Sequence, residues 1–446
     1  MRNSIPRLLL SLLLGLSLPL PASAQKQFSQ LPASTRTLIS IKVTGSKRYS
    51  EQTIAAASGL QLGTPVTEDD FKIAARRLGD MGVFTDVGYT YSFTSAGTKL
   101  ELQVTDVAKF VPVRFEDFVW FTDEELLKRI KESAPLFDGE LPLFGKLADQ
   151  VSDVLQAMLV ERSIPGQVEY VRSGKGNGPV DSIIYQVSNV VIQIRNVEFT
   201  GAAPTELSAL KAAAQRVFDR EYSRTVLSAL VQHQLLPVYY ARGYLKAAFG
   251  PPQPKVVKQP SENNDAGIHN LTVVDVIFAV TPGQQYKLKN LEWSGNQAFS
   301  SDVLQKMVHA RTGEPANTVH IGDNLKDIQK LYGSRGYVTA TLAVNADFND
   351  AASTVALRII VKEGFVFHMG ELALRGLDNS LTDKLRNAWK IRPGDVYDAT
   401  YLSEYLPIAQ KLLPSGLDWE VSSHVTANIG DKTVDVDLIY TAKAPK

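Results

Sequence analysis

The sequence contains no cysteine among its 446 residues. This absence excludes disulfide bonds, thiolate metal ligands and lipidation at a cysteine after export. Beyond the first 24 residues no stretch approaches 18 consecutive apolar residues, so no transmembrane segment is predicted in the mature chain. The chain also has no excess of positive or negative charge, because it contains 47 basic and 47 acidic residues. A basic footprint for nucleic acid is therefore excluded.

The patterns of enzymes and cofactor sites are lacking as well. No nucleophile elbow occurs, and the histidines are scattered without metal-ligand spacing. The adjacent carboxylates at 69–70 and 124–125 lie in the first turns of predicted helices, where the helix dipole explains them without a catalytic role. The loop at 173–179 holds Gly174, Gly176 and Gly178, but it lacks the lysine and the strand-loop-helix context of a phosphate site and favours a flexible hairpin. We therefore expect a non-enzyme without metal or cofactor. The six histidines are His233, His269, His309, His320, His368 and His424.

The first 24 residues have the layout of a cleavable export signal. The alternative is an N-terminal membrane anchor, but the apolar run is short for a span and prolines break it. We expect a periplasmic protein, in which 25–36 is a flexible lead-in. The signal consists of Arg2, Arg7, an apolar run over 8–20, and the small residues Ala22 and Ala24 before Gln25.

Residues 286–364 show the most complete copy of a sequence pattern that the chain repeats. Apolar residues four and two positions before Gly295 predict a strand that the glycine ends. Ser300 has the chemistry of a helix N-cap, and a second amphipathic helix closes at the Arg-Gly-Tyr sequence of 335–337. Alternating apolar residues then predict two strands, at 338–344 and 355–361. The order is β-α-α-β-β.

The pattern recurs with weaker signals through the rest of the chain. Its clearest marks are glycines that end the first strand or close the second helix: Gly45, Gly82, Gly201, Gly243, Gly295, Gly336 and Gly376. Repeat two diverges, with Asp117 in place of the strand-ending glycine, and repeat three carries a hairpin insert at 251–270, predicted as a disordered excursion. The predicted repeats are 37–107, 108–189, 190–283, 284–364 and 365–446.

These spacings and the Arg-Gly-Tyr turn resemble the POTRA (polypeptide-transport-associated) domain of the outer-membrane barrel-assembly family, which includes BamA. The resemblance implies an α+β fold of tandem modules in an elongated array, each a three-stranded mixed sheet covered by two helices. Family members follow the array with a membrane β-barrel of about 300 residues or more. Only 82 residues follow Gly364, and they have the pattern of a fifth repeat. We expect this chain to lack the C-terminal barrel.

An unpaired sheet edge can receive an extended chain as an added strand. We therefore expect binding of unfolded outer-membrane polypeptides, or of a barrel-bearing assembly protein or lipoproteins, with the chain associated with the outer membrane through such partners. The alternative is a structural scaffold of the cell envelope that binds only folded partners. The resemblance places the strand after the Arg-Gly-Tyr turn at the edge, with the contact residues Tyr337, Val338, Thr339, Ala340, Thr341, Leu342, Ala343 and Val344.

A second strand carries alternating aromatic residues, Tyr89, Tyr91 and Phe93. Such a row can recognise extended polypeptide, or it can pack one face of the strand against a core, which is the commoner cause. Both interpretations are open at this point.

Overall fold

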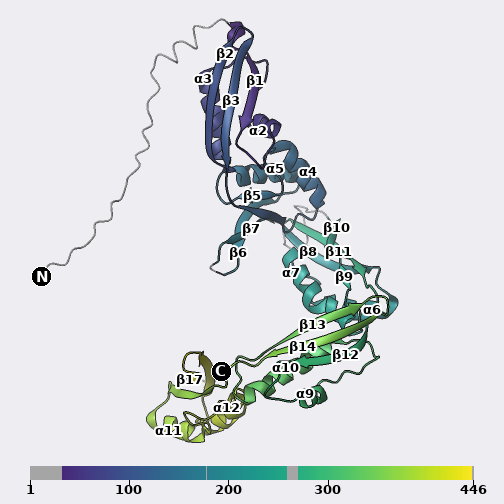
Figure 1. Cartoon of the computed structure of the whole chain (residues 1–446), viewed down its shortest axis with the longest axis vertical. Helices are drawn as coiled ribbons and strands as arrows, with labels where there is room; N and C mark the ends of the chain where they lie inside the picture. The colour runs from purple at the N-terminus through teal and green to yellow at the C-terminus, as the bar shows by residue number, and fades with distance from the viewer. Residues whose placement is uncertain (1–32, 177, 259–269, 444–446) are drawn as a thin grey trace, which may run out of the picture. The chain divides into compact units, whose positions relative to one another are not determined.

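The computed structural model describes residues 33–176, 178–258 and 270–443. The predicted export signal at 1–24 and most of the lead-in at 25–36 lie outside these residues. The chain divides into two compact units, and the described strands form five sheets (Figure 1). Over the described residues, one unit comprises 33–195, 221–224 and 254–275, and the other 196–220, 225–253 and 276–443.

The first sheet has the order β1-β3-β2, with β1 parallel and β2 antiparallel to the central strand. Ser50 caps its first helix, and Thr67 and Asp70 form a capping box at the start of the second. The ring centroid of Tyr91 lies 5.3 Å from that of Phe71, which belongs to this helix. The aromatic row of β2 therefore packs against the helix. The elements are η1 (Ala33–Arg36), β1 (Leu38–Thr44), α2 (Glu51–Ser58), α3 (Glu68–Asp80), β2 (Phe84–Thr94) and β3 (Gly97–Asp106).

The second sheet has four strands in the order β5-β4-β7-β6. Thr122 and Glu125 form a capping box at the start of its first helix, and the predicted hairpin connects β6 to β7. The short strand β5 is an addition that the sequence did not indicate, because three residues are too few to show a period. The elements are β4 (Phe110–Phe115), α4 (Asp123–Ser133), β5 (Glu140–Pro142), α5 (Leu147–Glu161), β6 (Gln167–Gly174) and β7 (Val180–Ser188).

The third sheet has the order β10-β11-β8, and β9 also pairs with β11. The prediction of a disordered excursion at 251–270 is wrong for its first part, because Gln253–Lys258 forms β10; residues 259–269 lie outside the described part. Pro237 has no N–H to donate, and a π-helical turn precedes it. The elements are β8 (Val191–Thr200), α6 (Pro204–Ala214), η2 (Gln215–Val217), α7 (Arg224–Leu230), η3 (Val231–Leu235), α8 (Leu236–Tyr240), β9 (Ala248–Phe249), β10 and β11 (Leu271–Thr281).

The fourth and fifth sheets repeat the first, with the orders β12-β14-β13 and β15-β17-β16. In the fourth, one core joins Leu304 and Ile328 of the helices to Leu357 and Ile359 of the central strand. The predicted α+β fold of β-α-α-β-β modules is thus confirmed. The elements are β12 (Lys287–Ser294), α9 (Ser301–Met307), α10 (Thr318–Ser334), β13 (Thr341–Asn349), β14 (Thr354–Lys362), β15 (His368–Arg375), α11 (Asn379–Ala388), α12 (Tyr401–Leu412), β16 (Asp418–Asn428) and β17 (Thr433–Lys443).

The strand-ending glycines occupy equivalent positions, as the spacing predicts. Each has a positive φ, and a Cβ added to any of them would lie 2.0–2.4 Å from a carbonyl oxygen of the last strand of its own sheet. Only glycine permits both the left-handed backbone and this close approach. The four pairs are Gly45 with Val104, Gly201 with Val280, Gly295 with Val361 and Gly376 with Tyr440.

The turn glycines that close the second helices also have a positive φ: 79° at Gly82, 82° at Gly243 and 83° at Gly336. At the last of these, the glycine carbonyl accepts the backbone N–H of Phe367 at 2.8 Å. The turn therefore ends the helix of one module and bonds to the first residues of the next.

Replacing Gly336 by valine should consequently destabilise the junction of the fourth and fifth modules by on the order of 1 kcal/mol or more, because a β-branched residue is penalised at positive φ. An added Cβ would also lie 2.9 Å from side-chain atoms of Val366 and Val396. Thermal melting of the full chain measures the effect. Gly322→Val, at a helical glycine with open space around its Cβ position, is the control. Equal melting of the two variants would contradict the assignment.

Candidate strand-binding edge

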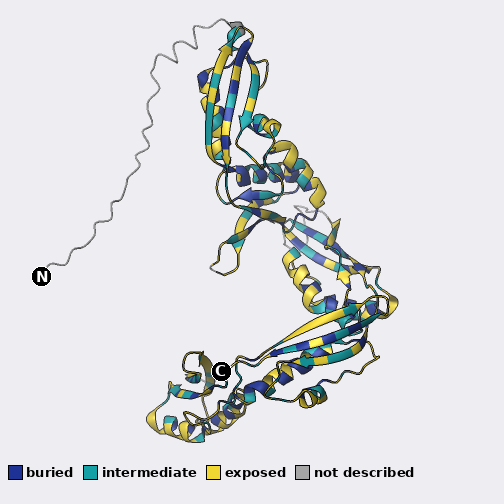
Figure 2. Cartoon of the chain, in the orientation of Figure 1, coloured by how far each residue is buried: buried dark blue, intermediate teal, exposed yellow. Residues whose placement is uncertain are grey.

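The strand β13 is an edge of the fourth sheet. It pairs with β14 in an unbroken antiparallel register from Thr341 to Asn349, and among the described residues no strand lies on its other side. Seven of its nine residues are exposed, and the strand is largely yellow in Figure 2. Leu342 and Phe348 pack partly against the core and hold the strand in place. The outward N–H and C=O groups of β13 are available to another strand.

The predicted position of this strand is wrong at its start. Tyr337, Val338, Thr339 and Ala340 lie in the turns that follow α10, and the strand begins only at Thr341. Of the eight predicted contact residues, Thr341, Leu342, Ala343 and Val344 belong to the edge strand. Ala340 is 2% exposed, because it is part of the core below the sheet.

The opposite edge of the same sheet is closed where β12 begins. Leu288 donates its backbone N–H to Glu314 and accepts that of Gly313, at 2.9 and 2.8 Å, so the loop between the helices pairs with the start of β12. A register shift between Leu288 and Asn290 also interrupts the pairing of β12 with β14. Such bulges make an edge a poor template for another strand. Within this sheet, β13 is therefore the regular and open edge.

Both ends of β13 are fixed by polar contacts. At its start, Gln329 donates a side-chain N–H to the carbonyl of Ala340 at 2.9 Å. Just past its end, the Asp350 carboxylate accepts hydrogen bonds from Lys246 Nζ and from the Tyr286 hydroxyl, each at 2.7 Å. These two hydrogen bonds, that of Lys246 first, lower the pKa of Asp350. A fixed edge loses little conformational freedom on binding.

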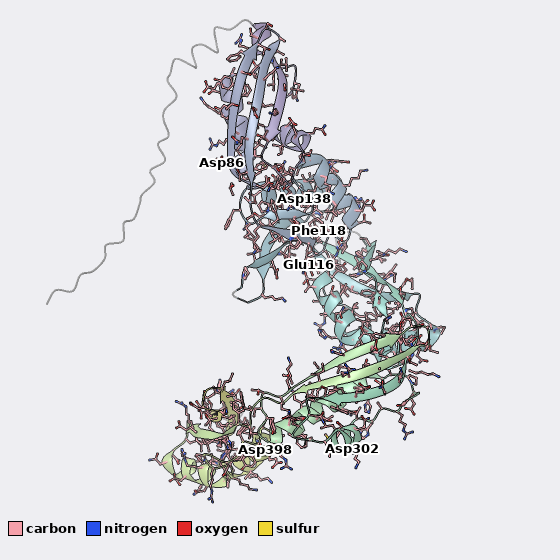
Figure 3. The ribbon with its side chains drawn as sticks, viewed as in Figure 1. Asp86, Glu116, Phe118, Asp138, Asp302 and Asp398 are labelled. Carbon is pink, nitrogen blue, oxygen red and sulfur yellow. The ribbon has the colours of Figure 1, made fainter. Side chains whose placement is uncertain are left out.

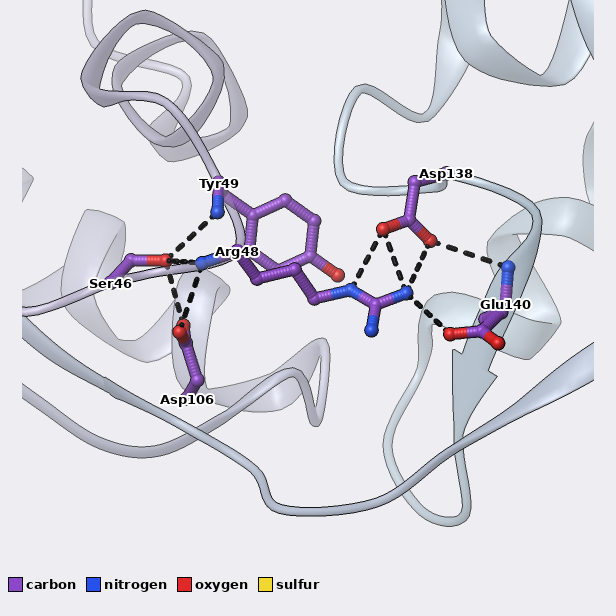
Figure 4. Close-up of polar contacts among 6 residues, drawn as sticks. All are labelled: Ser46, Arg48, Tyr49, Asp106, Asp138 and Glu140. Atoms are coloured by element: carbon purple, nitrogen blue, oxygen red, sulfur yellow. Dashed lines mark hydrogen bonds and ion pairs between the residues drawn. The ribbon is translucent and has the colours of Figure 1, made fainter.

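A polar cluster joins the loops of the first and second sheets inside the first unit (Figure 4). Arg48 donates to both carboxylate oxygens of Asp138 at 2.7 Å and to Glu140 at 2.8 Å. Its guanidinium carbon lies 3.7 Å from the ring centroid of Phe110. Asp106 holds the Arg48 loop by accepting its backbone N–H at 3.2 Å. A bidentate ion pair with a stacked aromatic ring fixes this junction.

The divergent second module replaces its strand-ending glycine with an acid. The Asp117 carboxylate accepts the backbone N–H of Val187 at 2.7 Å, so the side chain makes the link to the last strand. Burial, and to a smaller extent the charge of nearby Glu116, labelled in Figure 3, raise the pKa of Asp117 to about 7, against the lowering effect of the hydrogen bond from Val187. The Glu116 carboxylate accepts a hydrogen bond from the Ser223 hydroxyl at 2.6 Å.

Other kinds of site lack support in the part of the chain that the structure describes. No group of three or more metal-binding side chains occurs over 33–176, 178–258 and 270–443. Across the same residues, every helix is too short or too polar to cross a membrane. His309 and His320 stack at a centroid distance of 6.1 Å, without a further metal-binding side chain to complete a site.

Comparison with known proteins identifies the module. Residues 286–364 match the POTRA family, described as a surface antigen variable number repeat. They contain the fourth sheet and its edge strand. This chain therefore contains a POTRA domain.

Two curated relatives extend the comparison. A candidate outer membrane protein assembly factor of Treponema pallidum is 24% identical over 48% of this chain, and the assembly factor BamA of Neisseria meningitidis is 22% identical over 37%. The matches span 25% and 22% of those proteins. Domains POTRA3–5 of Haemophilus influenzae BamA match 57% of this chain and 96% of their own, at 22% identity and a TM-score of 0.43. The chain thus contains one region that matches the POTRA family, and other parts of it are similar in sequence to outer membrane protein assembly factors, of which it spans about a quarter.

Proposed function

We propose that this protein acts in the periplasm in outer-membrane protein assembly or transport, binding extended segments of unfolded outer-membrane polypeptides as an added strand on β13. The observation that carries the proposal is the free, regular edge from Thr341 to Asn349. Main-chain hydrogen bonds along an edge supply affinity for many sequences, as a protein that handles varied clients requires. The names of the two relatives support the same process.

The second candidate function is a structural scaffold that binds only folded partners, including a barrel-bearing assembly protein or lipoproteins. The fixed junctions at Arg48 and Asp350 favour it, because they hold neighbouring modules together. The two functions differ in their ligand. A scaffold does not bind isolated extended peptides, whereas a strand-binding edge does.

Two adjacent proline variants test the edge. Neighbouring residues of an edge strand point their N–H groups alternately toward the sheet and away from it. Of Ala343→Pro and Val344→Pro, one should therefore weaken binding of an extended peptide to the full chain by roughly tenfold with little change in melting, since it removes one donor. The other should destabilise the module, because it breaks a bond to β14.

Leu357→Pro, in the central strand, is the control that should unfold the module. Hydrogen exchange of the full chain, with and without peptide, reports both quantities: local stability, and protection of 341–349 on binding. Undiminished peptide binding by both edge variants, or protection confined to the helices, would end the proposal and favour the scaffold.

A further inference from the structure

We propose that residues 25–32, the lead segment between the predicted export signal and the first module, dock onto that module by packing Phe28 against the aromatic row of β2. The row consists of Tyr89, Tyr91 and Phe93. The contact is made by side chains and adds no strand to the sheet. The inference does not rest on the proposed function, because it concerns another module and a segment of the same chain.

The aromatic row ends in an exposed ring. Tyr89 and Tyr91 pack on Phe71 of α3, with ring centroids 6.3 and 5.3 Å apart. Phe93 continues the row, 5.5 Å from Tyr91, and is 39% exposed. An apolar side chain placed over Phe93 would remove this surface from water, and a second ring adds favourable aromatic contact. The end of the row therefore offers a surface to a further aromatic residue.

A buried hydrogen-bond acceptor lies beside the row. Glu68, the first residue of α3, is 8% exposed, and its Oε1 pairs with Lys72 Nζ at 3.1 Å. Its Oε2 is buried and accepts no hydrogen bond from residues 33–176, 178–258 or 270–443. Burial, and then the charge of Glu68, raise the pKa of Tyr91, so the carboxylate lies close to the row. A buried acceptor without a donor is costly, which favours a donor from outside the described fold.

The chain enters the first module next to the exposed end of the row. The Thr35 carbonyl accepts a hydrogen bond from the Thr98 hydroxyl at 2.7 Å, and Thr98 is the cross-strand partner of Phe93. The short helix η1 also contacts β2 and β3. Leu31 and Phe28 precede Thr35 by at most about 14 and 25 Å of extended chain, and the row is about 13 Å long. Both side chains therefore reach it.

The composition of the lead segment fits this surface. Besides Phe28 and Leu31, its eight residues include three glutamines, one lysine, one serine and no acid. The apolar side chains suit Phe93, and the amide and ammonium groups are donors for the Oε2 atom of Glu68. Pro32 favours an extended backbone at the residue before it. The segment can therefore lie along the row as an extended chain.

The covalent connection favours the lead segment over any other occupant. A segment tethered at Thr35 is present at an effective concentration in the millimolar range, far above that of a second copy in solution. The sequence left open whether the row packs a core or recognises extended polypeptide. We infer that it does both, and that the recognised polypeptide is part of the same chain. An outside peptide would have to displace the lead segment to contact Phe93.

A photocrosslink tests the docking in the exported full chain. Since the sequence has no cysteine, Gln30→Cys introduces a unique thiol for a benzophenone label and leaves Phe28 and the row unchanged. We expect crosslinks, mapped by mass spectrometry, to concentrate in 67–94. Phe28→Ser should lower this yield roughly fivefold or more, because it removes the apolar contact. Gln27→Ser, a matched change in the same segment, should leave it nearly unchanged.

A variant on the other side of the contact completes the test. Phe93→Ser should lower the crosslink yield in 67–94 as Phe28→Ser does. Circular dichroism and melting establish that this variant keeps its fold, which the 39% exposure of Phe93 favours. Phe28→Ser lies outside the described fold and remains informative by itself.

The distribution of crosslinks decides the inference. Crosslinks spread over the chain, or a yield in 67–94 that Phe28→Ser leaves unchanged, would overturn it. A covalent dimer would show that a second copy occupies the row, and would overturn it too. Deleting 25–32 should leave hydrogen exchange of the amides at 85–93 unchanged, and faster exchange there would reveal an added strand instead. None of these outcomes involves β13, so the proposed function stands or falls separately.

Discussion

Gly295→Ala should destabilise the POTRA module at 286–364 by about 3 kcal/mol or more, the sum of positive-φ strain and steric overlap. The backbone at this glycine has a φ of 81°, and an alanine Cβ would lie 2.2 Å from the carbonyl oxygen of Val361. The clash is with backbone, so no rotamer change relieves it. The end of β12 would have to move away from β14, the central strand.

The matched control lies in the same module. Gly313 has a φ of 87° and no atom within 4 Å of an added Cβ. Gly313→Ala should therefore show only the conformational penalty, on the order of 1 kcal/mol. Hydrogen exchange of peptides from 286–364 in the full chain gives the local free energies. If the two alanine variants lose the same stability, the close approach to Val361 is not what requires glycine at 295.

Asp117→Asn should stabilise the second module at pH 8 by on the order of 2 kcal/mol and leave its stability unchanged near pH 4. Burial raises the pKa of Asp117 from 3.8 to about 7, whereas the unfolded chain keeps the ordinary value. Between these values the folded protein binds a proton that the unfolded chain has lost. Stability from this group therefore falls as the pH rises from about 4 to about 7, and is constant above that.

Asparagine does not titrate and keeps an oxygen that can accept the N–H of Val187. The difference in the free energy of unfolding between the variant and the unmodified protein should therefore increase as the pH rises. Trp120, retained as the sole tryptophan, reports urea unfolding of this module. Asp302→Asn, at an exposed carboxylate in another module, controls for the loss of a charge. A constant difference between pH 4 and pH 8 would show that the pKa of Asp117 is the same in the folded and the unfolded chain.

The sequence by itself determined the local features of the modules. Strand-ending glycines, capping boxes and helix-closing turns depend on backbone conformations that only certain residues adopt, and each is visible in a window of a few residues. The central strand β14 (Thr354–Lys362) was also predictable, because its residues alternate between the core and the more exposed face of the sheet. Repetition of these signals at similar spacing established the β-α-α-β-β order and the POTRA resemblance.

Tertiary structure decided which residues form the open edges. Val338 and Ala340 alternate like strand residues, yet Val338 packs against the core of the fifth module and Ala340 lies in the core of the fourth, so neither belongs to β13. The extra strands β5 and β10 exist because β4 and β11 offer them pairing partners outside their own segments. Whether an edge is open depends on such long-range pairing, which no local pattern records. For that reason β16, the edge strand of the fifth sheet, became apparent only in the folded chain.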